Sequence, residues 1–255
     1  MCTVSWVHQP GGYQLLSNRD EKLTRGIALA PALLEQGGVR FIAPIDADSG
    51  GTWLAANEFG ISLCLLNGDA GTASSGASSR RSRGLLLREL AGAPSGNECF
   101  SGLKRLDLGP FAPFVLLILE PGRSAILAEW NGKDLTMDLA GDSHMPLTSS
   151  SYDAPGVRRF RLNEFARHVD PARPIEPETL HGFHSSHGSS PDAYSPCMHR
   201  ADAETVSFSW VIVTREEVRF LYSPSAPCRR TPTEQQVLTR TRTRAKPLPA
   251  LTEAS

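Results

Sequence analysis

The sequence predicts an α+β domain built mainly from short antiparallel strands. Most of the chain consists of brief β-prone, apolar runs separated by Gly, Pro, Asn and Asp turn residues. Two segments, 82–90 and 157–168, have helical character instead. The chain has 255 residues, of which 40% are hydrophobic and 21% charged, an ordinary globular composition. We therefore expect one domain over residues 1–228, followed by an Arg-, Thr- and Pro-rich tail at 229–255 that is loosely ordered.

Charge and apolar content exclude several classes of protein. The formal net charge is -1, so we expect no nucleic-acid partner. No run reaches the 18 or so apolar residues that span a bilayer, and the first 25 residues are too polar for a signal peptide. The five cysteines are widely spaced and form no CxxC pair, which indicates reduced thiols. The simplest expectation is a cytoplasmic protein.

The amino terminus carries a candidate nucleophile, Cys2. Because the second residue is small, we expect aminopeptidase to remove Met1 and leave Cys2 with a free α-amine. Such an amine has a pKa of about 7.7–8.0 and a free thiol one of about 8.5. One residue would then supply both an attacking sulfur and the base that activates it.

A polar tetrad follows the first predicted hairpin. Strands at 3–8 and 13–17 are joined by the turn signal Pro10-Gly11-Gly12, which brings residues 18–21 (Asn-Arg-Asp-Glu) beside Cys2. Strand alternation predicts that Asn18 and Asp20 share one face while Arg19 and Glu21 share the other. The alternative is a solvated turn.

A third polar cluster is expected at the end of a second hairpin. Residues 51–60 form a strand and a tight turn in which Gly60 suits a positive φ, and 61–66 form the returning strand, with Cys64 as a small core residue. This strand ends at Asn67-Gly68-Asp69, and a loop over 68–84 could frame the mouth of a pocket.

Together these stretches resemble the NRDE family, which includes the transport and Golgi organisation protein 2 group. The motifs are Met1-Cys2-Thr3, Asn18-Arg19-Asp20-Glu21, Gly51-Thr52-Trp53-Leu54, Asn57-Glu58-Phe59-Gly60 and Leu66-Asn67. The family is similar to choloylglycine hydrolases and penicillin V acylases, which are amino-terminal nucleophile (Ntn) hydrolases. The resemblance implies a four-layer αββα sandwich of two antiparallel sheets, and hydrolysis of carbon-nitrogen bonds in non-peptide amides.

Site residues follow from the same resemblance. It implies Cys2 as nucleophile, Arg19 and Asp20 as the residues that orient the terminus, and Asn67 as an oxyanion donor. Ser149 stands where the hydrolases carry an oxyanion-hole asparagine. A hydroxyl is a shorter donor, so this departure puts acylase-type activity in doubt. Asn18 and Ser149 are expected to contact the substrate.

A histidine-rich stretch leaves three readings open. His181, His184 and His187 are followed by Cys197-Met198-His199-Arg200. Imidazole and thiolate ligands suit zinc or iron, but the spacing is not that of a zinc motif, and a polar loop is the simpler expectation. In the third reading the loop covers the Cys2 pocket and offers His187 or Arg200 to the substrate.

Two functions are therefore expected from the sequence. The first is an Ntn hydrolase of a small-molecule acyl amide, which requires no metal or other cofactor. The second is a non-catalytic carrier of a hydrophobic ligand such as a lipid or haem, with histidines near the pocket mouth. Substrate identity is left open, and a homo-oligomer is compatible with the sequence.

Overall fold

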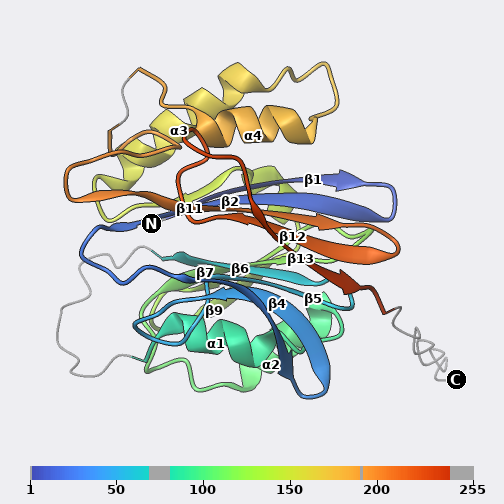
Figure 1. Cartoon of the computed structure of the whole chain (residues 1–255). Helices are drawn as coiled ribbons and strands as arrows, with labels where there is room; N and C mark the ends of the chain where they lie inside the picture. The colour runs from blue at the N-terminus through green and yellow to red at the C-terminus, as the bar shows by residue number, and fades with distance from the viewer. Residues whose placement is uncertain (1, 69–80, 190–191, 242–255) are drawn as a thin grey trace, which may run out of the picture.

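A computed structural model describes residues 2–68, 81–189 and 192–241. Two antiparallel sheets lie face to face, and a pair of helices covers the outer surface of each sheet (Figure 1). The predicted αββα sandwich is thus confirmed. The loop predicted over 68–84 lies largely outside the described residues, since only residue 68 and residues 81–84 are described.

The first sheet contains the amino terminus. Its strand order is β10 (Leu147–Ser149), β1 (Cys2–Gln9), β2 (Gly12–Lys22), β11 (Ala203–Val213), β12 (Glu217–Ser223) and β13 (Glu234–Thr239). The predicted first hairpin is β1–β2, in which Cys2 pairs with Arg19 and Gln9 with Gly12. Cys2 therefore begins a strand that has a neighbour on both sides.

The second sheet is formed by the middle of the chain. Its order is β3 (Leu29–Gln36), β4 (Val39–Ile45), β5 (Leu54–Asn57), β6 (Ser62–Asn67), β7 (Phe114–Leu119), β8 (Ile126–Trp130) and β9 (Leu135–Asp138). The predicted second hairpin is β5–β6, and its turn contains Gly60 at φ +81°. The short 3-10 helix η1 (Gly141–His144) leads from this sheet back to β10.

Four helices form the outer layers. α1 (Arg83–Leu90) and α2 (Gly96–Arg105) pack on the second sheet, whereas α3 (Ala154–His168) and α4 (Pro177–Ser185) pack on the first. The Asp153 carboxylate caps α3 by accepting a hydrogen bond from the Gly156 backbone N–H. Among the described residues, no helix combines the length and the apolar character needed to cross a bilayer.

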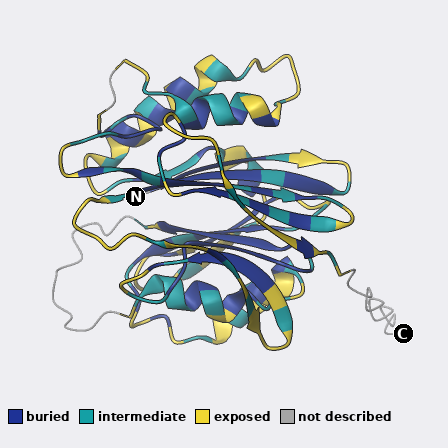
Figure 2. Ribbon diagram, in the orientation of Figure 1, coloured by how far each residue is buried: buried dark blue, intermediate teal, exposed yellow. Residues whose placement is uncertain are grey.

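Apolar residues alternate along the strands and fill two main cores. One core lies between the sheets and contains Cys2, Trp6, Leu15 and Leu66, together with Cys64, as predicted for that thiol. A second core lies between the second sheet and α1 and α2. Figure 2 shows that buried residues are concentrated in the strands of both sheets. Burial of this apolar surface is the main source of stability.

The expected tail is wrong over its first part, because residues 234–239 form β13 at the edge of the first sheet, where Val218 pairs with Leu238. Arg240 follows and donates to the backbone oxygens of Gly11 (3.0 Å), Thr214 (2.7 Å) and Phe59 (3.2 Å). Composition missed the strand because an edge strand needs only one buried side chain, here Leu238. Residues 242–255 lie outside the described residues.

Candidate active site around Cys2

Cys2 lies at the end of the sandwich where β1 begins. Its two cross-strand partners are Arg19 on β2 and Ser149 on β10. The residue is 7% exposed and belongs to the core between the sheets. It opens into a cavity of about 440 Å³, called here the Cys2 cavity. The walls of this cavity include Arg19, Asp20, Glu21, Arg25, Asp46, Trp53, Asn67, Arg81 and Arg83.

The surroundings of Cys2 keep its thiol protonated. Burial raises the pKa of the Cys2 thiol, while the positive amino terminus and Arg19 lower it by less and the Asp20 charge adds to the rise. A thiolate is therefore not the resting form at neutral pH. Nucleophilic attack by Cys2 would require a base that takes the thiol proton as the reaction begins.

Arg19 is held rigidly in the wall of the Cys2 cavity. Its Nη2 lies 2.7 Å from Asp46 Oδ2, and its guanidinium stacks over Trp53 at 4.3 Å from the ring centroid. Burial alone would raise the pKa of Asp46, but hydrogen bonds from Ser49 and the charges of Arg25 and Arg19 lower it overall. The carboxylate thus stays charged and fixes Arg19.

Asp20 points to the other side of the sheet, as strand alternation predicts. Its Oδ1 accepts from Thr205 Oγ1 at 2.6 Å, and its Oδ2 lies 3.1 Å from Arg161 Nη2 on α3. The Asp20 and Arg161 side chains are both 0% exposed. Arg161 also donates to the hydroxyls of Thr3 and Thr148, which follow Cys2 and precede Ser149. These contacts make Asp20 part of a buried network beneath the site.

Sequence reasoning missed Arg161 and Asp46. Arg161 lies in the predicted helix, but nothing in a helical pattern distinguishes a buried arginine from the exposed Arg158 and Arg159 beside it. Asp46 lies in the loop before the Gly51 motif, where an aspartate is also an ordinary turn residue. Only the tertiary arrangement shows that each carries an ion pair beside Cys2.

Asn18 is not a substrate contact, and that prediction is wrong. The side chain is fully buried toward α4, and its Nδ2 donates to the backbone oxygens of His184 (2.9 Å) and Pro196 (2.8 Å). It lines neither of the two cavities at this end of the molecule. Asn18 shares its face of β2 with Asp20, so it joins the sheet to the helical layer.

Ser149 contacts the nitrogen of Cys2. Its Oγ accepts a hydrogen bond from the Cys2 backbone nitrogen at 3.2 Å. After removal of Met1 this nitrogen would be the free α-amine. The hydroxyl is therefore in place to orient the prospective base, a different task from that of an oxyanion donor.

Asn67 lies where two cavities meet, at the end of β6. It lines the Cys2 cavity and also a larger groove of about 880 Å³, called here the α3 groove. The walls of the α3 groove include Val115, Leu127, Met137, Leu147, Ser149, Arg158 and Leu162. Within the described residues, no hydrogen bond engages the Asn67 side chain, which leaves its amide available to a ligand.

His187 and Arg200 do not cover the Cys2 cavity, so that reading of the histidine-rich stretch is wrong. Neither residue lines the Cys2 cavity or the α3 groove. Arg200 pairs with Asp202 at 2.8 Å and lies over the Tyr152 ring. His187 lies beside Cys197, and His184 is buried against Ser5. The histidines of this stretch therefore give no support to a haem site at the mouth of either cavity.

Comparisons with known proteins agree with this geometry at the level of family and fold. A family model described as Transport and Golgi organisation 2 matches residues 1–162. An N-acylethanolamine-hydrolyzing acid amidase ortholog from Caenorhabditis elegans has a similar structure, with 10% identity, TM-score 0.55, and coverage of 83% of this chain and 92% of that one. Penicillin V acylase from Agrobacterium tumefaciens is similar over 88% of this chain and 83% of its own, with 10% identity and TM-score 0.50. A search of curated proteins finds no match.

Proposed function

The chain belongs to the Transport and Golgi organisation 2 family, and we propose that it is an Ntn hydrolase that cleaves a non-peptide amide through Cys2. The observation that carries this proposal is the setting of Cys2. Its thiol opens into a cavity lined by Arg19 and Asn67, while its nitrogen contacts the Ser149 hydroxyl. The fold shared with an acid amidase ortholog and a penicillin V acylase supports this class of reaction.

The proposed reaction begins with removal of Met1. The free α-amine of Cys2, oriented by Ser149 Oγ, takes the thiol proton as the sulfur attacks the substrate carbonyl carbon. The Asn67 amide stabilises the negative charge that develops on the carbonyl oxygen. The protonated amine then gives its proton to the departing nitrogen, which leaves a thioester on Cys2. Water hydrolyses this thioester and restores the thiol.

The two cavities suggest how an amide would bind. Four arginines and the acidic residues Glu21 and Asp46 line the Cys2 cavity, which suits a polar amine portion. The α3 groove is larger and includes the apolar side chains of Leu127, Met137 and Leu162, which suit an acyl chain. Asn67 lines both, so the scissile bond would lie near this residue. The similar structures are named as an N-acylethanolamine-hydrolyzing acid amidase ortholog and a penicillin V acylase, which supports an N-acyl amide as substrate.

Intact mass and substrate hydrolysis test the proposal together. The purified protein should lack Met1 and should hydrolyse members of a panel of N-acylethanolamines, N-acyl amino acids and penicillin V. Cys2→Ala should abolish this activity, whereas Cys99→Ala, which removes a buried thiol in α2, should retain it. Retention of Met1, or equal hydrolysis by wild type and Cys2→Ala, would refute the mechanism.

A carrier function is the second candidate, and the exposed apolar side chains of the α3 groove favour it. Met137 and Leu162 are 42% and 37% exposed there, and Ser149 occupies the position of a hydrolase asparagine. A carrier would bind a fluorescent fatty acid equally well as wild type and as Cys2→Ala, with no hydrolysis of any amide. In either case we propose a cytoplasmic location, with the thiols reduced.

A further inference from the structure

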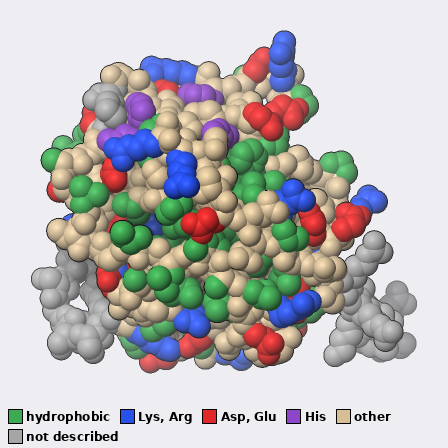
Figure 3. Space-filling model, viewed as in Figure 1, with side chains coloured by type: hydrophobic (Ala, Val, Ile, Leu, Met, Phe, Trp, Pro, Cys, Tyr) green, Lys and Arg blue, Asp and Glu red, His purple; other side chains and the backbone are tan. Residues whose placement is uncertain are grey.

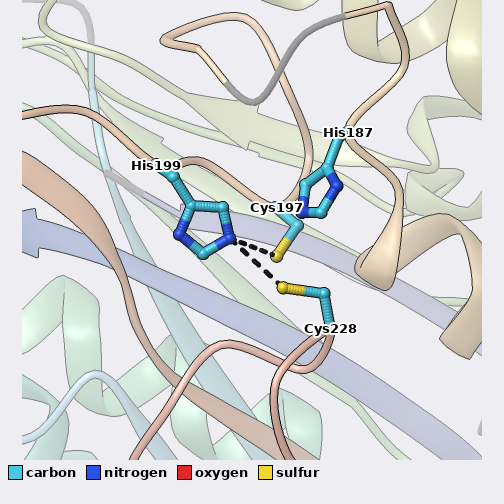
Figure 4. Close-up of side chains that lie close together, drawn as sticks. All are labelled: His187, Cys197, His199 and Cys228. Atoms are coloured by element: carbon cyan, nitrogen blue, oxygen red, sulfur yellow. Dashed lines mark hydrogen bonds between the residues drawn. The ribbon is translucent and has the colours of Figure 1, made fainter.

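Four potential metal ligands converge outside the Cys2 site. His187, Cys197, His199 and Cys228 each direct one nitrogen or sulfur atom toward the others (Figure 4), and these four atoms all lie within 4.8 Å of one another. The residues come from three segments: the residues just after α4, the loop before β11, and the connection between β12 and β13. We propose that they bind one zinc ion at a structural site with two cysteine and two histidine ligands.

The distances suit tetrahedral coordination. Zinc bonds of about 2.3 Å to sulfur and 2.0–2.1 Å to nitrogen place neighbouring ligand atoms roughly 3.3–3.8 Å apart. His199 Nε2 lies 3.5 Å from Cys197 Sγ and 3.2 Å from Cys228 Sγ. These two separations already match a zinc site, and since all four atoms lie within 4.8 Å of one another, shifts of about 1 Å would bring the remaining atoms around the ion. Two thiols would release their protons to water, giving a neutral centre without any redox step.

A buried histidine nitrogen gives independent support. The Nε2 atom of His187 is buried and has no hydrogen-bond partner in the described part of the chain. An imidazole nitrogen kept from water costs free energy unless it is bound to something. A metal ion would satisfy this atom. The His187 and His199 rings lie edge to face with centroids 5.2 Å apart, so both imidazoles face the same space.

The surroundings of His199 are typical of a histidine that binds a metal through one ring nitrogen. Its Nδ1 lies 3.4 Å from Glu204 Oε2, and the same oxygen accepts from Arg229 Nη1 at 2.8 Å. A carboxylate on one ring nitrogen fixes the tautomer and leaves the other nitrogen free to bind a metal. Here the other nitrogen is Nε2, the atom that lies near both sulfurs.

Hydrogen bonds to backbone oxygens hold His187 and Cys197 in this arrangement. The Cys197 N–H donates to Ser186 O at 3.0 Å, and Ser195 Oγ donates to His187 O at 3.0 Å. Four protein ligands would fill the tetrahedron and leave no position for substrate, which indicates a structural rather than a catalytic metal. Figure 3 shows histidine side chains gathered near the surface on the side of the helical layer. The ion would tie α4 to the connection that leads into β13.

The proposed zinc site does not depend on the hydrolase mechanism. None of its four ligands lines the Cys2 cavity, and all lie beyond residue 162, where the family-model match ends. The four ligands have the spacing His187-x9-Cys197-x-His199-x28-Cys228, which differs from the closely spaced ligand pairs of a zinc motif. His181 and His184 face the sheet, where His181 stacks on Trp210.

Metal analysis of the full chain tests the zinc site. Protein expressed with added zinc and purified without chelator should contain one zinc ion per chain, measured by mass spectrometry of the metal. Cys228→Ser and His187→Gln should lose most of it, and Cys228 is exposed, so its replacement should not disturb folding. His181→Gln and Cys2→Ala are matched controls that should keep the metal.

Cobalt and chelators supply two further readouts. Cobalt in place of zinc should give the visible bands of tetrahedral cobalt with thiolate-to-metal charge transfer in wild type, but not in Cys228→Ser. A strong chelator should lower the melting temperature of wild type and leave that of Cys228→Ser unchanged. Metal-free wild-type protein, a disulfide between Cys197 and Cys228, or zinc retained by both ligand variants would overturn the proposal.

Discussion

The buried ion pair between Arg161 and Asp20 allows a quantitative test of the network beneath Cys2. Both side chains are fully buried, with Nη2 and Oδ2 3.1 Å apart. Replacing Arg161 with Met removes this cation from the Asp20 carboxylate, and removing one partner of a buried pair costs about 3–5 kcal/mol. Arg161 also holds the hydroxyls of Thr3 and Thr148, so the strand positions of Cys2 and Ser149 should loosen as well.

Urea unfolding followed by circular dichroism measures this cost. Arg161→Met should lower the free energy of unfolding by about 3–5 kcal/mol, while Arg159→Met, an exposed arginine on the same helix, should change it by less than about 0.5 kcal/mol. Combining Arg161→Met with Asp20→Asn should recover at least about 0.5 kcal/mol, because the buried carboxylate charge that faced Arg161 is removed as well. A loss below about 1 kcal/mol for Arg161→Met, or no recovery in the double variant, would refute the assigned ion pair.

Three further outcomes follow from the structure. Asn67→Ala should lower kcat about 100- to 1000-fold if its amide holds the oxyanion, whereas Asn18→Ala should lower the melting temperature instead because it frees two buried carbonyls. Burial lowers the pKa of His184 from 6.5 to about 3, with His181 and Arg161 adding to the effect, so the unfolded chain binds its proton first and stability should fall as pH drops below 6.5 toward 3. His184→Leu should reduce the slope of the unfolding free energy against pH, measured between pH 7 and pH 4.5, by up to about 1.4 kcal/mol per pH unit. An unchanged slope would contradict the assignment. Gly12→Ala should lower the melting temperature below that of the wild type, because the added Cβ would lie 1.7 Å from the Val213 backbone oxygen.

Local sequence signals predicted the fold well because they coincide with short-range structure. The hairpins β1–β2 and β5–β6 join residues close in sequence, and their turns carry Gly at the positions that need it. The strand β13 was missed because its pairing with β12 depends on tertiary context and its residues are mostly polar. Propensity is a weak guide to such an edge strand.

The parts of the candidate site that depend only on strand pairing and alternation could be predicted from the sequence. The Cys2–Arg19 pairing follows from the length of one hairpin, and the opposed faces of Arg19 and Asp20 follow from alternation. The residues that bind these side chains could not be predicted from the sequence. Arg161 lies 141 positions from Asp20 in the chain, and no pattern in a single sequence indicates which buried cation a carboxylate will meet.

Arg240 links the two sheets of the sandwich at one end. It ties three turns together at the end of the two sheets where β1 ends, and Cys2 lies at the opposite end, where β1 begins. One guanidinium thus links turns of both sheets at the end of the sandwich away from the candidate nucleophile, and it adds to the core that joins the sheets.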